Sequence, residues 1–320
     1  PQNIAIFVNL KKLKMQAMPK KGYGIVDILL RSVLLCVGLL PRRCLCALSD
    51  ALAFVAGRVV GYRRRVVMDN LQKAFPDKPE KERRRIAAAT YRNFFDAMLN
   101  IFRIRYASQR RVMRSVTHVH LKMLQDLYAR GGSGIILAAH YSCWEYIGTV
   151  QPYIGHRSVA AYQPLSFAPL ERVIAEARGR FGATMAALRE VFRVLLESQA
   201  HGEVTLALMV ADQSPARGAC THWLTLLGQR TPVLIGPERI AQKLGCAVMY
   251  LRVVELRRFC YQYELVMLSE NAAQEKPMAV TKKFYAELEK DLLRAPHCWM
   301  WTHRRWKNQN RYEVEKICEA

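Results

Sequence analysis

The pattern of apolar and polar positions changes near residue 131 and predicts an α/β fold in the second part of the chain. Short apolar runs there predict buried strands at 135–139, 158–162, 204–211, 246–254 and 260–268. Helical patterns separate or follow them, near 168–180, 190–200, 236–244 and 281–293. Strands that alternate with helices favour a mostly parallel sheet flanked by helices.

The first part of the chain reads as helical. The run IVDILLRSVLLCVGLL, residues 25–40, is apolar but shorter than the roughly 20 residues that span a bilayer. Asp27 and Arg31 interrupt it four residues apart, so they can pair on one helical face. Ser49-Asp50 are expected to cap a second apolar helix over 51–62. A long helix should begin at Pro79-Glu80 and another segment should cover 121–129.

These patterns divide the chain into four expected parts: a basic leader (1–21, where Met15 and Met18 are alternative natural starts), a helical membrane-associated region (22–130), an α/β domain (131–310) and a tail (311–320). The two apolar helices, each followed by clustered arginines, suit an anionic membrane surface. The alternative is an ordinary amphipathic pair packed on the core.

Positive charge is concentrated at the front of the chain. The protein carries 49 Lys and Arg against 26 Asp and Glu, a net charge of +23, and residues 1–130 hold 26 of the cations but 8 of the acids. Such a surface attracts anionic lipid, nucleic acid or an acidic protein. The nine cysteines form no CxxC pair or zinc spacing, which favours reduced thiols and no metal site.

Candidate chemistry follows the predicted strands. His140 directly follows the run IILAA and Glu145 comes five residues later, while Asp212 and Gln213 come after the strand at 204–211. If Glu145 lies in the first turn of the next helix, it can hold His140 as a general base for an attacking alcohol. The structural alternatives are a capping box from Ser142 to Glu145 and a buried histidine bonded to backbone.

Longer segments resemble a known family. HYSCWE resembles the HxxxxD/E motif of the lysophospholipid acyltransferase superfamily, whose fold is glycerolipid acyltransferase-like. GYRRRVVMDNLQKAFPDK, AYQPL, EARGRFGA, ADQSPARG, GQRTPVLIGPERIAQKLG and WMWTHRRWK look, in this order, like bacterial lipid A biosynthesis late acyltransferases. The resemblance covers residues 22–307.

The resemblance implies fatty acyl transfer from acyl-carrier protein to a hydroxyl of a lipid A precursor, without a cofactor. The reaction would take place at the cytoplasmic face of the inner membrane, on a monotopic protein or one with a single N-terminal membrane helix. His140 and Glu145 take the catalytic positions. The implied substrate-binding residues are Arg178 (for a phosphate or the oxyanion), Arg180, Asp212, Gln213 and Tyr162.

Two departures from the family concern Ser142-Cys143, where many relatives have Gly-Asn, and Gln163, where many have Arg. The second removes a phosphate contact and leaves another lipid acceptor, a lysophospholipid or an aminoacyl lipid, as the alternative. A basic nucleic-acid-binding protein is a distant alternative, since no zinc-finger spacing or Gly-rich phosphate loop is present. The tail 299–307 interleaves Trp with cations, which suits a headgroup layer, base stacking or closure of the core.

Overall fold

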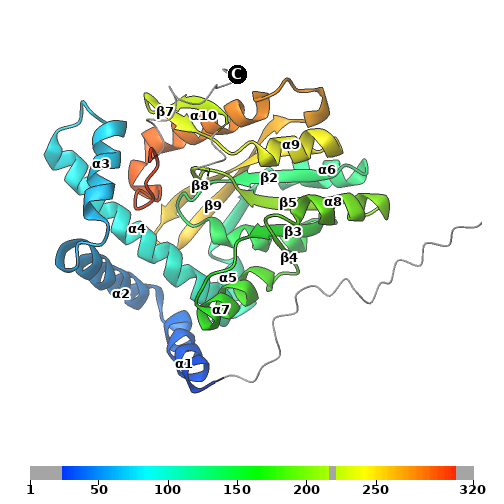
Figure 1. The fold of residues 1–320 in the computed structure, drawn as a ribbon. Helices are drawn as coiled ribbons and strands as arrows, with labels where there is room; N and C mark the ends of the chain where they lie inside the picture. Colours follow the sequence, from blue (N-terminus) through cyan, green and yellow to red (C-terminus); the bar gives the residue numbers. More distant parts are fainter. Residues whose placement is uncertain (1–23, 216–220, 308–320) are drawn as a thin grey trace, which may run out of the picture.

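A seven-stranded sheet forms the centre of the molecule. The computed structural model describes residues 24–215 and 221–307, and its sheet has the order β1-β9-β8-β2-β5-β3-β4 (Figure 1). All neighbours are parallel except β8 and β9, so the predicted mostly parallel α/β sheet is confirmed. The strands are β1 (Val116–Val119), β2 (Gly134–Ala138), β3 (Arg157–Tyr162), β4 (Thr184–Ala187), β5 (Thr205–Val210), β8 (Ala247–Arg257) and β9 (Cys260–Ser269).

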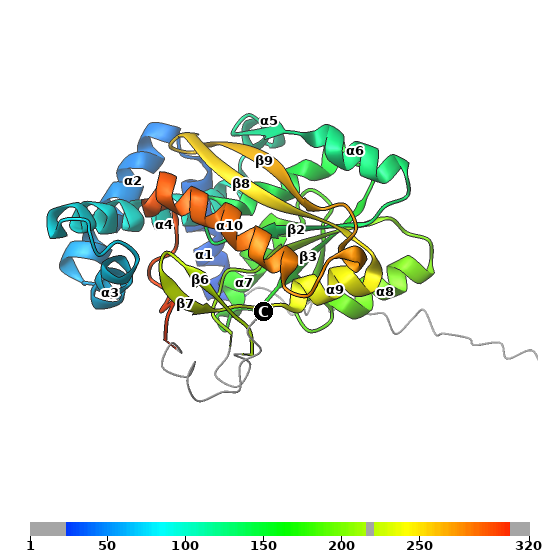
Figure 2. The ribbon, with the colours of Figure 1, turned by 90° about the horizontal axis from the view of Figure 1, so that it is seen from above.

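Helices cover both faces of this sheet. The two views place α9 and α10 on one face and α7 with the N-terminal helices on the other (Figures 1 and 2). The predicted helices are present: α6 (Leu121–Ala129), α7 (Ala168–Gly179), α8 (Val191–Ala200), α9 (Gly236–Leu244) and α10 (Ala279–Arg294). The central strand β2 is buried along its whole length, as expected for a strand with helices on both sides.

Four short strands escaped prediction. β1 (VTHV) and β4 (TMAA) have four residues each, too few for a recognisable apolar run. β6 (Trp223–Leu226) and β7 (Gln229–Pro232) form a separate hairpin, whose turn residues Leu227 and Gly228 both have positive φ. Because β1 pairs with β9, the sheet takes in residues ahead of the domain boundary expected at 131.

The N-terminal helices pack around one long helix. α4 (Glu80–Tyr106) begins where expected and contacts α1 (Ile25–Leu39), α2 (Arg42–Phe54) and α3 (Arg64–Ala74). The predicted cap at Ser49-Asp50 is wrong. α2 already begins at Arg42, after Pro41, and continues as a π-helical turn (Val55–Val59). Ser49 lies buried inside it and donates a hydrogen bond to the Arg92 carbonyl oxygen.

A network of ion pairs docks α1 on the domain. Arg31 binds Asp27 at 2.9 Å, which confirms the predicted pair, and also binds Glu176 on α7 at 2.8 Å. Arg172 binds Asp27 from α7, and Arg105 of α4 binds Glu176. The charged side of α1 therefore faces protein. Its other side exposes apolar residues, among them Ile25 (77% exposed), Val26, Leu29 and Val33.

Over residues 24–215 and 221–307, no single helix is both long and apolar enough to cross a membrane. Arg42–Val59 and Arg64–Ala74 satisfy the length and composition requirement only as a pair, and they meet at 90°.

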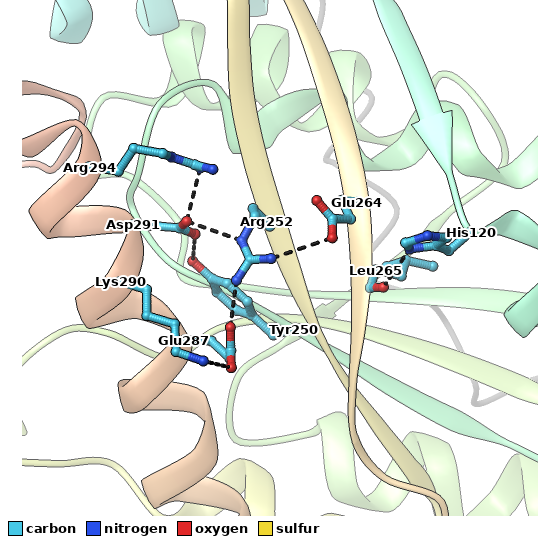
Figure 3. A network of polar contacts seen from close by, with 9 residues as sticks. All are labelled: His120, Tyr250, Arg252, Glu264, Leu265, Glu287, Lys290, Asp291 and Arg294. Atoms are coloured by element: carbon cyan, nitrogen blue, oxygen red, sulfur yellow. Dashed lines mark hydrogen bonds and ion pairs between the residues drawn. The ribbon is translucent and has the colours of Figure 1, made fainter.

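A second network attaches α10 to the sheet. Arg252 on β8 binds Asp291 at 3.1 Å, Glu287, and Glu264 on β9 at 3.4 Å (Figure 3). Asp291 is buried and also accepts a hydrogen bond from the Tyr250 hydroxyl at 2.7 Å. The Asp291 carbonyl oxygen accepts one from Tyr141. The network therefore supports the segment that directly follows β2.

We expect Asp291→Ala to lower the free energy of unfolding by about 1–3 kcal/mol, because it leaves the Tyr250 hydroxyl without its buried partner and removes the most buried of the three carboxylates that bind Arg252. Glu264→Ala is the matched control. That carboxylate is partly exposed and its contact is longer, so the expected loss is under about 1 kcal/mol. Urea unfolding followed by circular dichroism measures both, and equal losses would contradict this account of the network.

Candidate active site

The sheet itself brings His140 and Asp212 together. β2 and β5 are parallel neighbours, and Ala138 is in register with Val210. His140 and Asp212 each follow two residues later, so they leave the same edge of the sheet side by side. Ligands of open parallel sheets bind at this edge, beyond the carboxyl ends of the strands.

The carboxylate that holds His140 is Asp212. His140 Nδ1 lies 2.6 Å from Asp212 Oδ1, and the Gln213 amide nitrogen lies 3.1 Å from His140 Nε2. Both contacts fit one tautomer, in which Nδ1 carries the proton and Nε2 keeps its lone pair. A histidine held in this way by a carboxylate can accept a proton at Nε2. The His140 side chain is 18% exposed, so a substrate can reach it.

Asp212 is a buried charge with several partners. Besides His140, its side chain accepts a hydrogen bond from Trp299 Nε1 at 2.8 Å and pairs with Arg305 at 3.0 Å. Burial opposes ionisation, but His140, Arg305 and the hydrogen bonds hold the pKa of Asp212 well below its usual range. Asp212 is therefore ionised at neutral pH. Its contribution to stability is present above pH about 4 and is lost as the pH falls further.

Glu145 has a different partner from the one expected. It lies at the start of a 3-10 helix (Trp144–Tyr153), as predicted, but both its oxygens bind the Arg178 guanidinium, at 2.5 and 2.8 Å. Glu145 is buried, whereas the Arg178 side chain is 30% exposed. Nearby Glu145 raises the pKa of Arg178. The predicted His140–Glu145 contact is thus replaced by two pairs, His140–Asp212 and Glu145–Arg178.

The turn between the two pairs is anchored from β9. The Tyr263 hydroxyl donates to the Cys143 carbonyl and accepts from the Tyr146 amide at 3.1 Å. Ser142 has φ +52°, and its buried hydroxyl has no partner. The capping box considered for Ser142 and Glu145 is therefore not formed, since Cys143 precedes the helix without a side-chain cap.

Residues 298–306, here called the closing segment, complete the site. Its backbone flanks His140: the Ser142 amide donates to the Cys298 carbonyl at 2.7 Å and the Met300 amide to the His140 carbonyl at 3.1 Å. The Arg305 guanidinium is stacked 3.8 Å from the Trp299 ring centre. The Trp-rich stretch 299–307 thus closes the core at the site, which is one of the three roles expected for it from the sequence. Sequence reasoning did not assign Trp299 or Arg305 to the site, although the Trp cluster was a signal.

Two other predicted substrate-binding residues, Arg180 and Tyr162, are not among the described hydrogen-bond partners of His140. Arg180 follows α7 and donates a hydrogen bond to the Ile104 carbonyl oxygen, which links the end of α7 to α4. Tyr162 is the last residue of β3, so it leaves the same sheet edge as His140. Within the part of the chain that the structure describes, no group of three or more His, Cys, Asp or Glu side chains is arranged to hold a metal ion.

Comparison with known proteins shows the family of the chain. The family model for bacterial lipid A biosynthesis acyltransferase matches residues 14–308. The chain belongs to this family. The acyltransferase is 21% identical over 273 residues to the lipid A biosynthesis lauroyltransferase of Escherichia coli (strain K12), covering 84% of this chain and 87% of that one. It is 22% identical over 276 residues to the palmitoleoyltransferase of the same organism, with the same coverage.

A solved structure, the 1-acyl-sn-glycerophosphate acyltransferase of Thermotoga maritima, aligns with 79% of this chain and 97% of its own, at 12% identity and a TM-score of 0.35. The family model and the curated relatives confirm the resemblance seen in the sequence at the level of the family: the acyltransferase is an enzyme of lipid A biosynthesis type. The roles of its individual residues remain predictions.

We expect Arg178→Ala to lower the free energy of unfolding of the acyltransferase by about 1–3 kcal/mol, because it leaves the buried Glu145 carboxylate unpaired. Adding Glu145→Gln should restore part of the loss, since a neutral amide is less costly to bury. Arg180→Ala combined with Glu145→Gln is the control, where no recovery is expected. All variants are compared by urea unfolding. If Arg178→Ala with Glu145→Gln were less stable than Arg178→Ala alone, the pairing of Glu145 with Arg178 would be contradicted.

Proposed function

We propose that this acyltransferase moves a fatty acyl chain from acyl-carrier protein to a hydroxyl of a lipid A precursor, with His140 as the general base. The observation that carries the proposal is the position of His140. Asp212 fixes its tautomer from one side, and Nε2 on the other side contacts the amide of Gln213, its one hydrogen-bond partner within residues 24–215 and 221–307. An acceptor hydroxyl that replaces the Gln213 amide would find a ready proton acceptor.

The reaction needs no covalent enzyme intermediate. His140 Nε2 takes the proton of the acceptor hydroxyl while the oxygen of that hydroxyl attacks the thioester carbonyl carbon. The tetrahedral intermediate then collapses, the carbon–sulfur bond breaks, and the imidazolium returns the proton to the departing thiolate. Asp212 stabilises the imidazolium in between, and its ionisation is secured by Trp299 and Arg305.

Glu145 and Arg178 have a supporting role in this proposal. Arg178 uses Nε and Nη2 to hold Glu145, which leaves Nη1 to donate to the developing oxyanion or to a substrate phosphate. The anion-binding role expected of Arg178 is therefore compatible with its pairing. Gln213 lies against His140 and Tyr162 ends a neighbouring strand, so both are proposed to contact the substrate.

Exposed apolar surfaces on the N-terminal helices support the choice of a lipid acceptor. The exposed apolar face of α1 lies opposite its ion-paired face, and Phe54, Val59 and Val60 at the end of α2 are also exposed. We propose that these surfaces lie in the cytoplasmic interface of the inner membrane, in the monotopic manner. The net charge of +23 supports both an anionic membrane surface and an acidic acyl carrier as partners.

The test is acyl transfer by detergent-solubilised protein, read by mass spectrometry. Acyl-carrier protein loaded with chains of several lengths is the donor. A tetraacylated lipid A precursor and a lysophospholipid compete as acceptors. We expect a mass gain on the precursor that is lost in His140→Ala and falls by about 10³–10⁴ in Asp212→Asn, because the amide no longer selects the productive tautomer.

His201→Ala is the matched control, since His201 is an exposed histidine outside the site and should leave turnover unchanged. Product on the lysophospholipid alone would replace the acceptor and keep the chemistry. Normal turnover by His140→Ala would overturn the assignment of the base.

A further inference from the structure

A basic hollow opens on the surface beside the closing segment. It has a volume of about 630 Å³ and lies where the start of α3 meets the end of the closing segment. Four arginines line it together with three other residues: Arg63, Arg64, Arg65, Arg304, Gly61, Val66 and Met68. No acidic residue is among them. We call this site the arginine hollow.

Among the residues that the structure describes, no carboxylate pairs with the charges of the arginine hollow. All four arginines are exposed, and over residues 24–215 and 221–307 no carboxylate lies within ion-pair distance of any of them. α3 has no acidic residue in its first turn either, so the positive end of its dipole adds to the same field. Like charges held together repel one another, and an anion placed among them removes that cost.

The two walls of the arginine hollow are fixed to each other. Arg63, at the start of α3, has φ +51° and donates to the Thr302 carbonyl at 3.1 Å. About two helical turns further on, the buried Asn70 amide donates to the carbonyls of Trp301 and His303, both at 2.8 Å. The arginines are therefore mounted on a rigid junction, and a ligand need not order it on binding.

The chemistry of the arginine hollow favours phosphate. A guanidinium donates two parallel hydrogen bonds to a phosphate, and several such forks can surround one tetrahedral dianion. The apolar residues just before the hollow favour a phosphate carried by a lipid. Val59 and Val60 are 68% and 69% exposed and Tyr62 is 45% exposed, as expected for side chains that enter the acyl layer below a headgroup.

The closing segment connects the arginine hollow to the catalytic histidine. It supplies Arg304 to the hollow, while the next residue, Arg305, binds Asp212. Its Met300 amide bonds the His140 carbonyl. We propose that the arginine hollow binds the phosphate of the acceptor lipid's headgroup and so orients that lipid toward His140. The orienting role rests on the proposed function, whereas phosphate binding does not.

The experiment measures binding, which requires no turnover. Full-length protein is titrated with phosphatidylcholine vesicles that carry one of three probes. The probes are a bisphosphorylated tetraacylated glucosamine disaccharide, the same disaccharide without phosphates, and phosphatidylglycerol at matched charge. The test variant is Arg64→Gln with Arg65→Gln. The control is Arg110→Gln with Arg114→Gln, which removes two exposed arginines from α5 (Gln109–Met113) and its C-terminal cap.

We expect wild type to bind the bisphosphorylated vesicles most tightly. The test variant should lose on the order of tenfold or more in affinity for them, and the control should stay within about twofold. In transfer assays the test variant should raise the acceptor KM and leave kcat unchanged. Thermal unfolding checks that both variants fold.

Three results would overturn the proposal: equal losses in both variants, no loss in the test variant, or equal binding of the disaccharide without phosphates. If the binding that depends on Arg64 and Arg65 were as strong with phosphatidylglycerol vesicles as with the bisphosphorylated disaccharide, the bound phosphate would be that of a bilayer lipid. This result would overturn the orienting role. Arg64- and Arg65-dependent binding without any acyl product would sink the proposed function and leave the arginine hollow as a phosphate site.

Discussion

The buried carboxylate of Asp212 is the constraint around which the site is organised. A charge with no exposed side-chain surface must be compensated, and three side chains from distant parts of the chain do so: His140, Trp299 and Arg305. These partners hold the end of β2, the end of β5 and the closing segment in one arrangement. The same contacts that make the charge tolerable also fix the tautomer of His140, so stability and chemistry depend on one carboxylate.

A second consequence concerns the N-terminal helices. The closing segment touches α3 through Asn70 and His140 through its backbone, and α7 joins α1 to Glu145 through Glu176 and Arg178. The surfaces proposed to meet the membrane are therefore bonded to the elements that hold the site. A lipid acceptor delivered from the interface would approach His140, the proposed base, along elements that are already fixed in place.

Sequence reasoning reached the fold and the position of several candidate site residues at strand ends because the signals were local. Apolar runs identified the long strands, and the position after each run identified His140, Asp212 and Gln213 as strand-end residues. The pairing was missed because it depends on the register of β2 against β5, which no local pattern records. Glu145, five residues from His140, was the nearest carboxylate in sequence. Arg305 was missed because its partner lies 93 residues away.

The most direct test of the central claim is the protonation pattern of the His140 ring, measured by nitrogen-15 NMR of histidine-labelled protein at neutral pH. His140→Ala identifies the signal. We expect the neutral form of the ring to carry its proton on Nδ1 and to leave Nε2 free, a pattern lost in Asp212→Asn but kept in Glu145→Gln. A proton on Nε2, or a pattern that responds to Glu145 rather than Asp212, would contradict the account.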